Sequence, residues 1–247
     1  MNNFFIVGAQ RCSTTWLYHM LNAHPTIQMN TTIRPEPKYF LKDDCILDQH
    51  SYFQSVFNQP LPNDNKVYGE KSTSYIESVA AAQKIKALFP DAKIVILVRD
   101  PIKRAISNYY FSLNNGVETR SCLDAVLGKG DRPVLKQVFS TDPFDYLGRG
   151  RYEKYIEDYF AVFGHDQVGI FVQENITNDI SSLNEVFDFL AVDPTLFKSD
   201  IHIQHNSSQK ENDTAALEHE LYQTLSGYYD STYDYLKNYV NIDCWKR

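Results

Sequence analysis

Five short apolar runs along the chain alternate with stretches in which apolar residues recur at helical spacing. The runs predict buried strands, and their alternation with helices indicates a parallel sheet with helices on both faces. We therefore expect an α/β fold, a three-layer sandwich around a central parallel sheet, in which residues 1–247 form a single domain. The expected strands lie near residues 3–7, 26–29, 67–70, 93–98 and 168–173.

The first apolar run leads directly into a loop of small and polar residues. After Gly8 and Ala9, residues 10–15 read Gln-Arg-Cys-Ser-Thr-Thr, and a helical pattern follows. A strand-to-helix turn of this kind directs backbone N–H groups and a helix N-terminus at one point, which suits a phosphate. In the spacing of an ATP-binding P-loop, Ser13 replaces the second glycine and Thr14 replaces the lysine. A generic strand-to-helix turn is the alternative.

A second strand-to-helix turn follows the run at residues 93–98. This run is too apolar throughout to be a strand with one exposed face. Pro101 suits the first helical turn, where a missing N–H costs little. Arg99 at the strand end and Ser107 two turns into the helix can converge on one phosphate. Alternatively, Arg99 caps the sheet edge and Ser107 bonds to its own helix backbone.

Two further segments place charged side chains where they can serve chemistry. Glu36 lies between two prolines, which hold its backbone extended and keep it out of a helix. Lys71 follows Glu70 at the end of the expected third strand. The alternatives are an exposed loop carboxylate at Glu36 and a Glu70–Lys71 pair with no catalytic duty.

Together these segments resemble the sulfotransferases that use 3′-phosphoadenosine-5′-phosphosulfate (PAPS), nearest their heparan sulfate and carbohydrate branch. The loop after the first strand is similar to the family's P-loop-like phosphosulfate-binding loop, with Arg11 as its cation. The Arg99-to-Ser107 spacing is similar to the 3′-phosphate-binding segment. Residues 34–40 resemble the K-E-P-H-F-F segment, with Lys38 in place of the histidine, and residues 70–75 resemble the E-K-[ST]-P-x-Y element.

This resemblance implies transfer of a sulfonate group from PAPS to a hydroxyl or amine of a carbohydrate or other small-molecule acceptor, without a metal. It implies that Glu36 is the catalytic base and that Arg11 and Lys71 stabilise the charge on the leaving oxygen. A histidine is the alternative base, but His24 has the position of a structural residue at a helix end and His50 has no motif around it. A P-loop kinase or other ATP-dependent transferase, and a catalytically silent nucleotide-binding protein, are the alternative functions. The implied cofactor contacts are Arg11, Cys12, Ser13, Thr14, Thr15, Trp16, Arg99, Ser107, Asn206 and Ser207.

The net charge of the chain limits which classes of binding partner we expect. A formal net charge of −7 argues against nucleic acid as a partner and mildly against a highly sulfated polyanion. The polar stretch from about residue 118 to residue 144 is either a substrate-facing insertion or a surface excursion. A basic rim can still form locally from Arg34, Lys38, Lys42, Arg149, Arg151 and Lys154.

Targeting signals and cysteine usage complete the expectations. We find no signal-peptide pattern and no apolar run of transmembrane length, so we expect a cytoplasmic protein with no membrane partner. The four cysteines lack metal-ligand spacing, which fits free thiols in a reducing compartment. The thiol of Cys12, beside Arg11 at a helix N-terminus, either has a lowered pKa or fills a small-residue position in the loop.

Overall fold

A five-stranded sheet forms the centre of the computed structural model, which describes residues 2–135, 137–198 and 211–245. The strand order is β2-β3-β1-β4-β5, and every neighbouring pair is parallel. The five strands predicted from the apolar runs and the α/β fold class are thereby confirmed. The strands are β1 (Asn2–Gly8), β2 (Ile27–Met29), β3 (Val67–Lys71), β4 (Lys93–Val98) and β5 (Val168–Val172).

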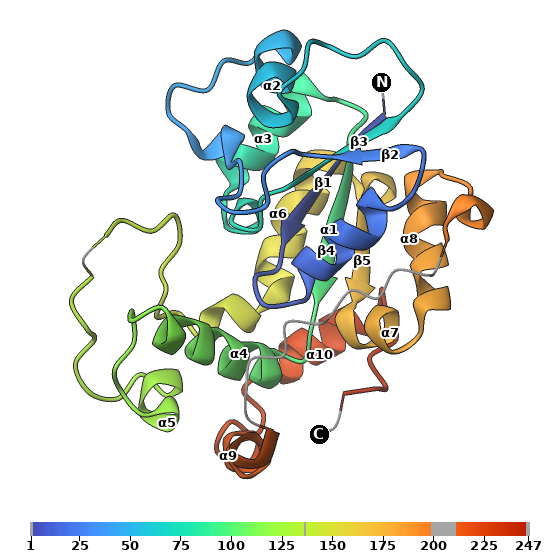
Figure 1. Ribbon diagram of the computed structural model, residues 1–247. Helices are drawn as coiled ribbons and strands as arrows, with labels where there is room; N and C mark the ends of the chain where they lie inside the picture. The colour runs from blue at the N-terminus through green and yellow to red at the C-terminus, as the bar shows by residue number, and fades with distance from the viewer. Residues whose placement is uncertain (1, 136, 199–210, 246–247) are drawn as a thin grey trace.

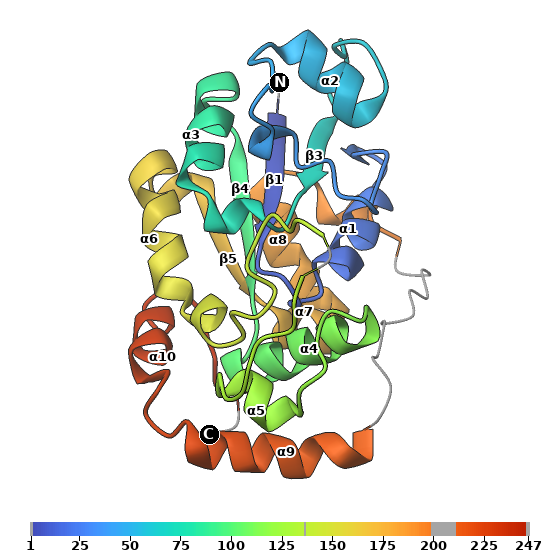
Figure 2. The ribbon, with the colours of Figure 1, turned by 90° about the vertical axis from the view of Figure 1, so that its left-hand side faces the viewer.

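Helices cover both faces of this sheet (Figures 1 and 2). The α1 and α8 helices share one face, where Nε2 of His24, just after α1, lies 2.9 Å from the carbonyl of Asp193, just after α8. The α3 and α6 helices cover the opposite face, where the Tyr159 hydroxyl donates to the Tyr75 carbonyl at 2.8 Å. The helices are α1 (Thr14–Asn22), α2 (Gln49–Phe57), α3 (Val79–Leu88), α4 (Pro101–Asn114), α5 (Cys122–Val126), α6 (Tyr152–Phe163), α7 (Gln173–Asn178), α8 (Leu183–Leu190), α9 (Glu211–Thr224) and α10 (Asp230–Leu236).

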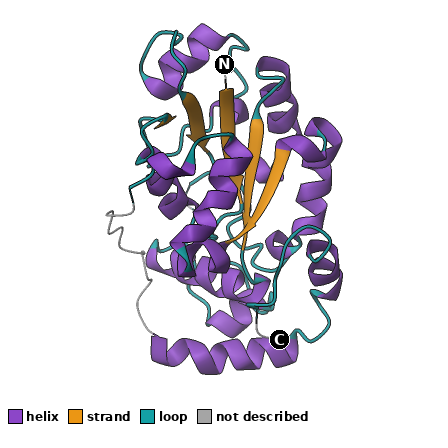
Figure 3. Cartoon of the chain, turned by 90° about the vertical axis from the view of Figure 1, so that its right-hand side faces the viewer, coloured by secondary structure: helices purple, strands orange, loops and turns teal. Residues whose placement is uncertain are grey.

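The central strands are buried because helices pack on both of their faces. Figure 3 shows the orange strands between purple helices. In β1, residues 4–7 are fully buried, and in β4, residues 94–98 are fully buried. Strands of a parallel sheet that are covered on both sides read as continuous apolar runs, which is why the sequence located them well.

One edge of the sheet gathers the loops that follow β1, β3 and β4. Because these strands are parallel, their carboxyl ends meet at the same edge, where open α/β sheets bind ligands. In Figure 1 this edge faces α4, and α9 packs against α4 beyond it. The polar stretch 118–144 follows α4 on this side of the molecule and contains only the short α5 among its described residues.

Membrane-spanning helices and metal-ligand clusters are both missing from the described residues. None of the helices in residues 2–135, 137–198 and 211–245 is long and apolar enough to cross a membrane. Within the same ranges, no group of three or more His, Cys, Asp or Glu side chains is placed to hold a metal ion.

Candidate functional site

The loop after β1 has the backbone geometry of an anion cradle. A Cβ atom at Gly8 would lie 2.8 Å from the Ile76 side chain, so only glycine fits there. Arg11 and Ser13 adopt the left-handed conformation, with φ of 71° and 57°. The side chain of Ser13 does not cap α1, which leaves this helix N-terminus facing the loop. Ser13 thus adopts the conformation that the second glycine of a P-loop would adopt without strain.

The two predicted phosphate sites are adjacent. Arg11 Nε donates a hydrogen bond to Ser107 Oγ on α4 at 3.2 Å. Arg99 Nη1, at the end of β4, donates to the Arg11 carbonyl at 3.3 Å. The Arg11 guanidinium also lies 4.7 Å from the centroid of the half-exposed Phe111 ring. The sheet therefore brings the loop after β1 and the start of α4 together as one basic site.

Positive charge in this basic site is not neutralised. Burial is the main cause that lowers the pKa of Arg11 to about 10, and the neighbouring charges of Arg99, Arg34 and Arg104 contribute to this fall. In the described part of the chain, none of the ion pairs within 4.0 Å involves Arg11, Arg99 or Arg104. The buried Nε of Arg99 also lacks a hydrogen-bond partner there. Cations that pair with no carboxylate among the described residues, with an unpartnered donor on one of them, favour an anionic ligand.

The Glu36 carboxylate lies at the end of β3 and is held from two sides. Lys71 Nζ donates to Glu36 Oε1 at 2.5 Å. The Thr73 N–H donates to Oε2 at 2.9 Å, and the Thr73 hydroxyl donates to Oε1 at 2.9 Å. Lys71 is 4 % exposed and Glu36 15 % exposed. The carboxylate therefore reaches solvent while its cationic partner is buried beneath it.

One polar chain links this carboxylate region with the phosphate loop. Gln10 Nε2, beside Arg11, donates to Ser74 Oγ at 3.2 Å. Ser74 Oγ lies 3.0 Å from Ser140 Oγ, and Lys38 Nζ donates to Ser140 Oγ at 2.8 Å. Lys38, which stands where the family has histidine, therefore contacts the stretch 118–144, whose far end reaches the candidate site.

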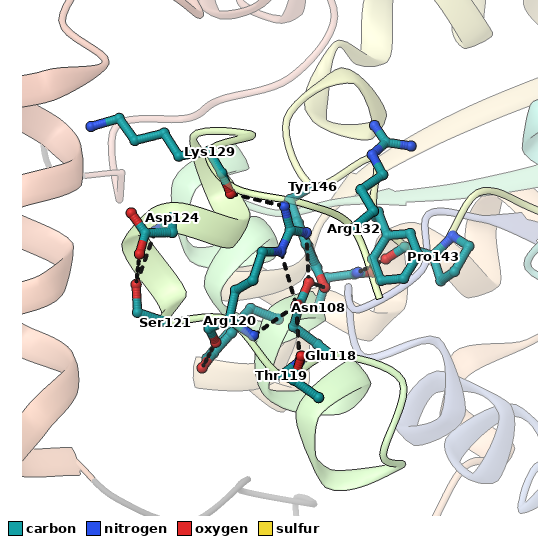
Figure 4. Close-up of polar contacts among 12 residues, drawn as sticks. Asn108, Glu118, Thr119, Arg120, Ser121, Asp124, Lys129, Arg132, Pro143 and Tyr146 are labelled. Carbon is teal, nitrogen blue, oxygen red and sulfur yellow. Dashed lines mark hydrogen bonds and ion pairs between the residues drawn. The ribbon is translucent and has the colours of Figure 1, made fainter. Parts of the chain in front are cut away.

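A buried carboxylate, Glu118, fixes the start of the stretch 118–144 (Figure 4). It accepts hydrogen bonds from the backbone of Thr119 at 2.9 Å, the guanidinium of Arg120 at 2.8 Å and the hydroxyl of Tyr146 at 2.9 Å. Burial alone would raise the pKa of Glu118, but these hydrogen bonds outweigh burial and lower it to about 2. The stretch is thus anchored beside α4, and the sequence carried no signal for this anchor.

The structure decides between the two alternatives for Cys12 and corrects the expectation for Arg149. The Cys12 thiol is buried 3.6 Å from the Tyr152 hydroxyl, and burial raises its pKa to about 11, so the thiol fills a position in the core and has no lowered pKa. Arg149 is wrong as a member of the basic rim, because it is buried and its Nη2 pairs with Glu77 Oε1 at 2.6 Å. Asn206 and Ser207 lie outside the described residues.

The remaining predicted residues differ in how far they are buried. Thr14 and Trp16 are buried in the first turn of α1, and Thr15 between them is half-buried. His24 is buried among structural contacts, whereas His50 is exposed beside Asp48. Thr73 was missed by sequence reasoning, although alternation beyond β3 places it on the same side as Lys71.

Comparisons with known proteins agree with this geometry. The bifunctional heparan sulfate N-deacetylase/N-sulfotransferase of Drosophila melanogaster is 26 % identical over 221 residues, which cover 82 % of this chain and 21 % of the relative. Mouse heparan sulfate glucosamine 3-O-sulfotransferase 3A1 is 24 % identical over 205 residues, which cover 83 % of this chain and 49 % of the relative. The chain therefore spans about a fifth to a half of the length of these relatives.

A solved structure and a family model extend the comparison to the whole fold. A sulfotransferase from Alicyclobacillus acidocaldarius superposes with a TM-score of 0.73 at 23 % identity, over 100 % of this chain and 99 % of that one. This similarity shows a shared fold. The sulfotransferase domain family model matches residues 1–231. The resemblance inferred from the motifs is confirmed, and the chain belongs to the sulfotransferase domain family.

Proposed function

We propose that this chain transfers a sulfonate group from PAPS to a hydroxyl or amine group of a glycan. The observation that carries the proposal is the convergence of Arg11, Arg99 and Ser107 on a helix N-terminus, with no carboxylate paired to these arginines among the described residues. The relatives whose names specify heparan sulfate support a glycan acceptor.

The basic site fits a nucleotide with two separate phosphate groups. Ser13, Thr14 and Thr15, at the start of α1, would bind a 5′-phosphate through backbone N–H groups and hydroxyls. Arg99 and Ser107 would bind a 3′-phosphate, which supplies the partner that Arg99 Nε lacks in the described part of the chain. PAPS supplies the sulfonate group to be transferred. Cys12 and Trp16, whose side chains are buried, would contribute through the backbone.

The Glu36 carboxylate is placed to accept the proton of the acceptor group. A carboxylate has about four lone-pair positions. Lys71 and Thr73 occupy three of them through close contacts in the described structure, and the partial exposure of Glu36 leaves an approach from solvent. A base within hydrogen-bond reach of the acceptor proton contributes about 10²–10⁴ in rate.

Two cations are placed to stabilise negative charge beside this base. Lys71 is buried against Glu36, and Arg11 lies in the loop that Gln10 joins to Ser74. Both charges are already oriented in a partly buried site, so they need little rearrangement when charge develops on the leaving oxygen. Such preorganised electrostatic stabilisation is usually the largest contribution to catalysis.

Thermal unfolding with adenosine 3′,5′-bisphosphate tests the donor site. At 100 times the Kd, a ligand that binds only the folded state stabilises it by about 2.7 kcal/mol, which raises the Tm by roughly 5–10 °C for a chain of this size. We expect this shift with the bisphosphate and not with ATP and Mg²⁺. A magnesium-dependent shift with ATP alone would overturn the proposal in favour of a kinase.

Turnover tests the reaction itself. We expect adenosine 3′,5′-bisphosphate to form from PAPS when N-desulfated heparan sulfate, which offers both amines and hydroxyls, is the acceptor. Binding of the bisphosphate without turnover on this or other acceptors, and without any effect of Glu36→Gln, would indicate a silent nucleotide-binding protein.

A further inference from the structure

A second carboxylate, Glu70, lies beneath the segment that carries Glu36. It is 0 % exposed at the end of β3. The hydroxyls of Ser72 and Tyr75 donate to its Oε1 at 2.7 and 2.6 Å, and the hydroxyl of Tyr52 donates to its Oε2 at 2.9 Å. The neighbouring ammonium of Lys71 is bound to Glu36 instead. Glu70 is thus a buried carboxylate held by three hydroxyl groups.

Two of these hydroxyls also bind the segment 36–40. The backbone N–H of Lys38 donates to Ser72 Oγ at 2.9 Å, and the backbone N–H of Phe40 donates to the Tyr75 hydroxyl at 3.0 Å. A hydroxyl group has one proton and two lone pairs. Because Ser72 and Tyr75 give their protons to Glu70, their lone pairs are turned toward the two N–H groups.

Side chains alternate in direction along the end of β3, which explains how this one segment contacts both Glu36 and Glu70. Successive side chains of an extended chain point to opposite sides. The side chains of Lys71 and Thr73 point to Glu36, whereas those of Glu70 and Ser72 point to the interior. The segment is therefore fastened at three alternate residues, 36, 38 and 40.

We propose that Glu70 is a positioning residue for Glu36: through the hydroxyls of Ser72 and Tyr75, its carboxylate fixes the backbone that carries the candidate base. This inference rests on the proposed role of Glu36. The Glu70 carboxylate touches no reacting group itself and acts through the two hydroxyls.

The chemistry of this position argues against a packing role alone. Burial of a carboxylate without a cationic partner is costly, whereas an apolar side chain would fill the same space at no such cost. Burial raises the pKa of Glu70 to about 7 despite the three hydrogen bonds. Only an acceptor can orient the two hydroxyls toward the N–H groups of Lys38 and Phe40, and this orientation is what the carboxylate provides.

Two tyrosines provide a matched pair for the test. Tyr52 and Tyr75 are both buried, both donate to Glu70 and both pack against the Phe40 ring. Only the Tyr75 hydroxyl accepts from the segment 36–40. The variants Tyr52→Phe and Tyr75→Phe therefore make the same chemical change and differ in this one contact.

Hydrogen–deuterium exchange of a peptide covering residues 36–41 measures the positioning directly. We expect Tyr75→Phe and Ser72→Ala to speed exchange of this peptide at least about fivefold, because a net hydrogen bond of about 1 kcal/mol is lost, while Tyr52→Phe leaves it within twofold of wild type. Ser72→Thr, which keeps the hydroxyl, restores the protection. Equal exchange in Tyr52→Phe and Tyr75→Phe, or wild-type exchange in Tyr75→Phe and Ser72→Ala, overturns the proposal.

Kinetics and binding separate this proposal from the proposed function. With PAPS and N-desulfated heparan sulfate, we expect Tyr75→Phe to lower kcat about tenfold or more at unchanged KM for PAPS, because small misplacement of a catalytic group is costly. Tyr52→Phe keeps kcat within about twofold. Failure of wild type to bind adenosine 3′,5′-bisphosphate would contradict the proposed function, whereas the exchange result would still decide whether the hydroxyls that bind Glu70 fix the segment.

Discussion

The two halves of the candidate site differ in how their charges are balanced. In the phosphate half, formed by the loop after β1 and the start of α4, Arg11 and Arg99 lie close together and Arg99 has an unpartnered donor within the described structure. In the base half, formed by residues 36–40 and 70–75, Lys71 neutralises Glu36 and three hydroxyls bind Glu70.

This difference indicates that one half of the site is built to bind an anion and the other half to hold catalytic groups in place. An anion entering the phosphate half gains hydrogen bonds that the protein does not already make, so that half is suited to affinity. The base half has made its contacts before any ligand arrives, so that it is suited to holding groups in a fixed geometry. Variants in the phosphate half should therefore change nucleotide affinity, and variants in the base half should change turnover.

The largest expected effect is on turnover in Glu36→Gln. Glutamine retains the shape and one acceptor oxygen but does not take up the acceptor proton. We expect kcat to fall about 10³-fold, within the range that general base catalysis contributes. The measurement is the rate of adenosine 3′,5′-bisphosphate formation from PAPS with N-desulfated heparan sulfate, together with the affinity for the bisphosphate, which should not change.

Glu77→Gln is the matched control for this variant. Glu77 is 19 % exposed and pairs with the buried Arg149, much as Glu36 is 15 % exposed and pairs with the buried Lys71. Both substitutions remove one carboxylate from one half-buried ion pair. An equal fall in kcat in the two variants would contradict the distinct role of Glu36 and indicate a general loss of structure.

The sequence predicted the phosphate half better than the base half, for a physical reason. Each strand-to-helix turn is local, so that Arg99 and Ser107 are placed by one strand end and one helix pitch. Their contact with Arg11 follows from parallel strands that share an edge. The chain-distant contacts of the base half, such as Thr73 with Glu36 and Lys38 with Ser140, depend on loop paths that no local pattern specifies.

Arg149 shows how a chain-distant contact can also make a local prediction wrong. An arginine in a glycine-rich turn has the local sequence of an exposed residue, and it was expected on a basic rim. Its burial depends on a partner 72 residues earlier, Glu77, which neutralises it. Pairing at such separation is decided by tertiary structure, and the comparable pair between Glu36 and Lys71 was not predicted from the sequence either.

The pH dependence of stability tests the cost of preorganisation in the base half. Burial raises the pKa of Glu70 from 4.5 to about 7, with the nearby Glu36 charge adding to the rise and the hydroxyls of Tyr75, Ser72 and Tyr52 opposing it. Between these values the folded state keeps a proton that the unfolded state releases, so the free energy of unfolding falls as pH rises. At 1.36 kcal/mol per pKa unit, this fall amounts to about 3 kcal/mol.

Urea unfolding of wild type and Glu70→Gln from pH 4.5 to pH 8 measures this contribution. Glutamine can accept from Ser72 and Tyr75 through its oxygen but does not titrate. We expect the stability of wild type relative to Glu70→Gln to decline from pH 4.5 to about 7 and to level off above it. Parallel stability curves would show that Glu70 has an ordinary pKa and that its burial carries no such cost.

In the phosphate half, Arg99→Ala should weaken nucleotide binding. Loss of a charge-assisted hydrogen bond to a phosphate costs about 1.5–3 kcal/mol, which corresponds to a rise of roughly 10- to 100-fold in the Kd for adenosine 3′,5′-bisphosphate. Isothermal titration calorimetry measures this rise. Arg132→Ala makes the same change in net charge at an exposed arginine paired with Asp142, and it should leave the Kd nearly unchanged. An equal rise in Kd in both variants would indicate that Arg99 contributes only to the overall positive charge and does not bind a phosphate directly.

The smallest expected effect concerns the backbone of the phosphate loop. Ser13 and Ser78 are both N-cap residues, but Ser78 is extended and its side chain accepts from the Ala81 N–H, whereas Ser13 is left-handed with no such bond. A left-handed conformation costs an ordinary residue about 1–2 kcal/mol, which glycine avoids at an entropic cost of about 0.5–1 kcal/mol. Ser13→Gly should therefore stabilise the protein by less than about 1 kcal/mol in urea unfolding, and Ser78→Gly should destabilise it slightly. A loss of stability in Ser13→Gly would mean that the Ser13 side chain, rather than the loop backbone, supports the phosphate half.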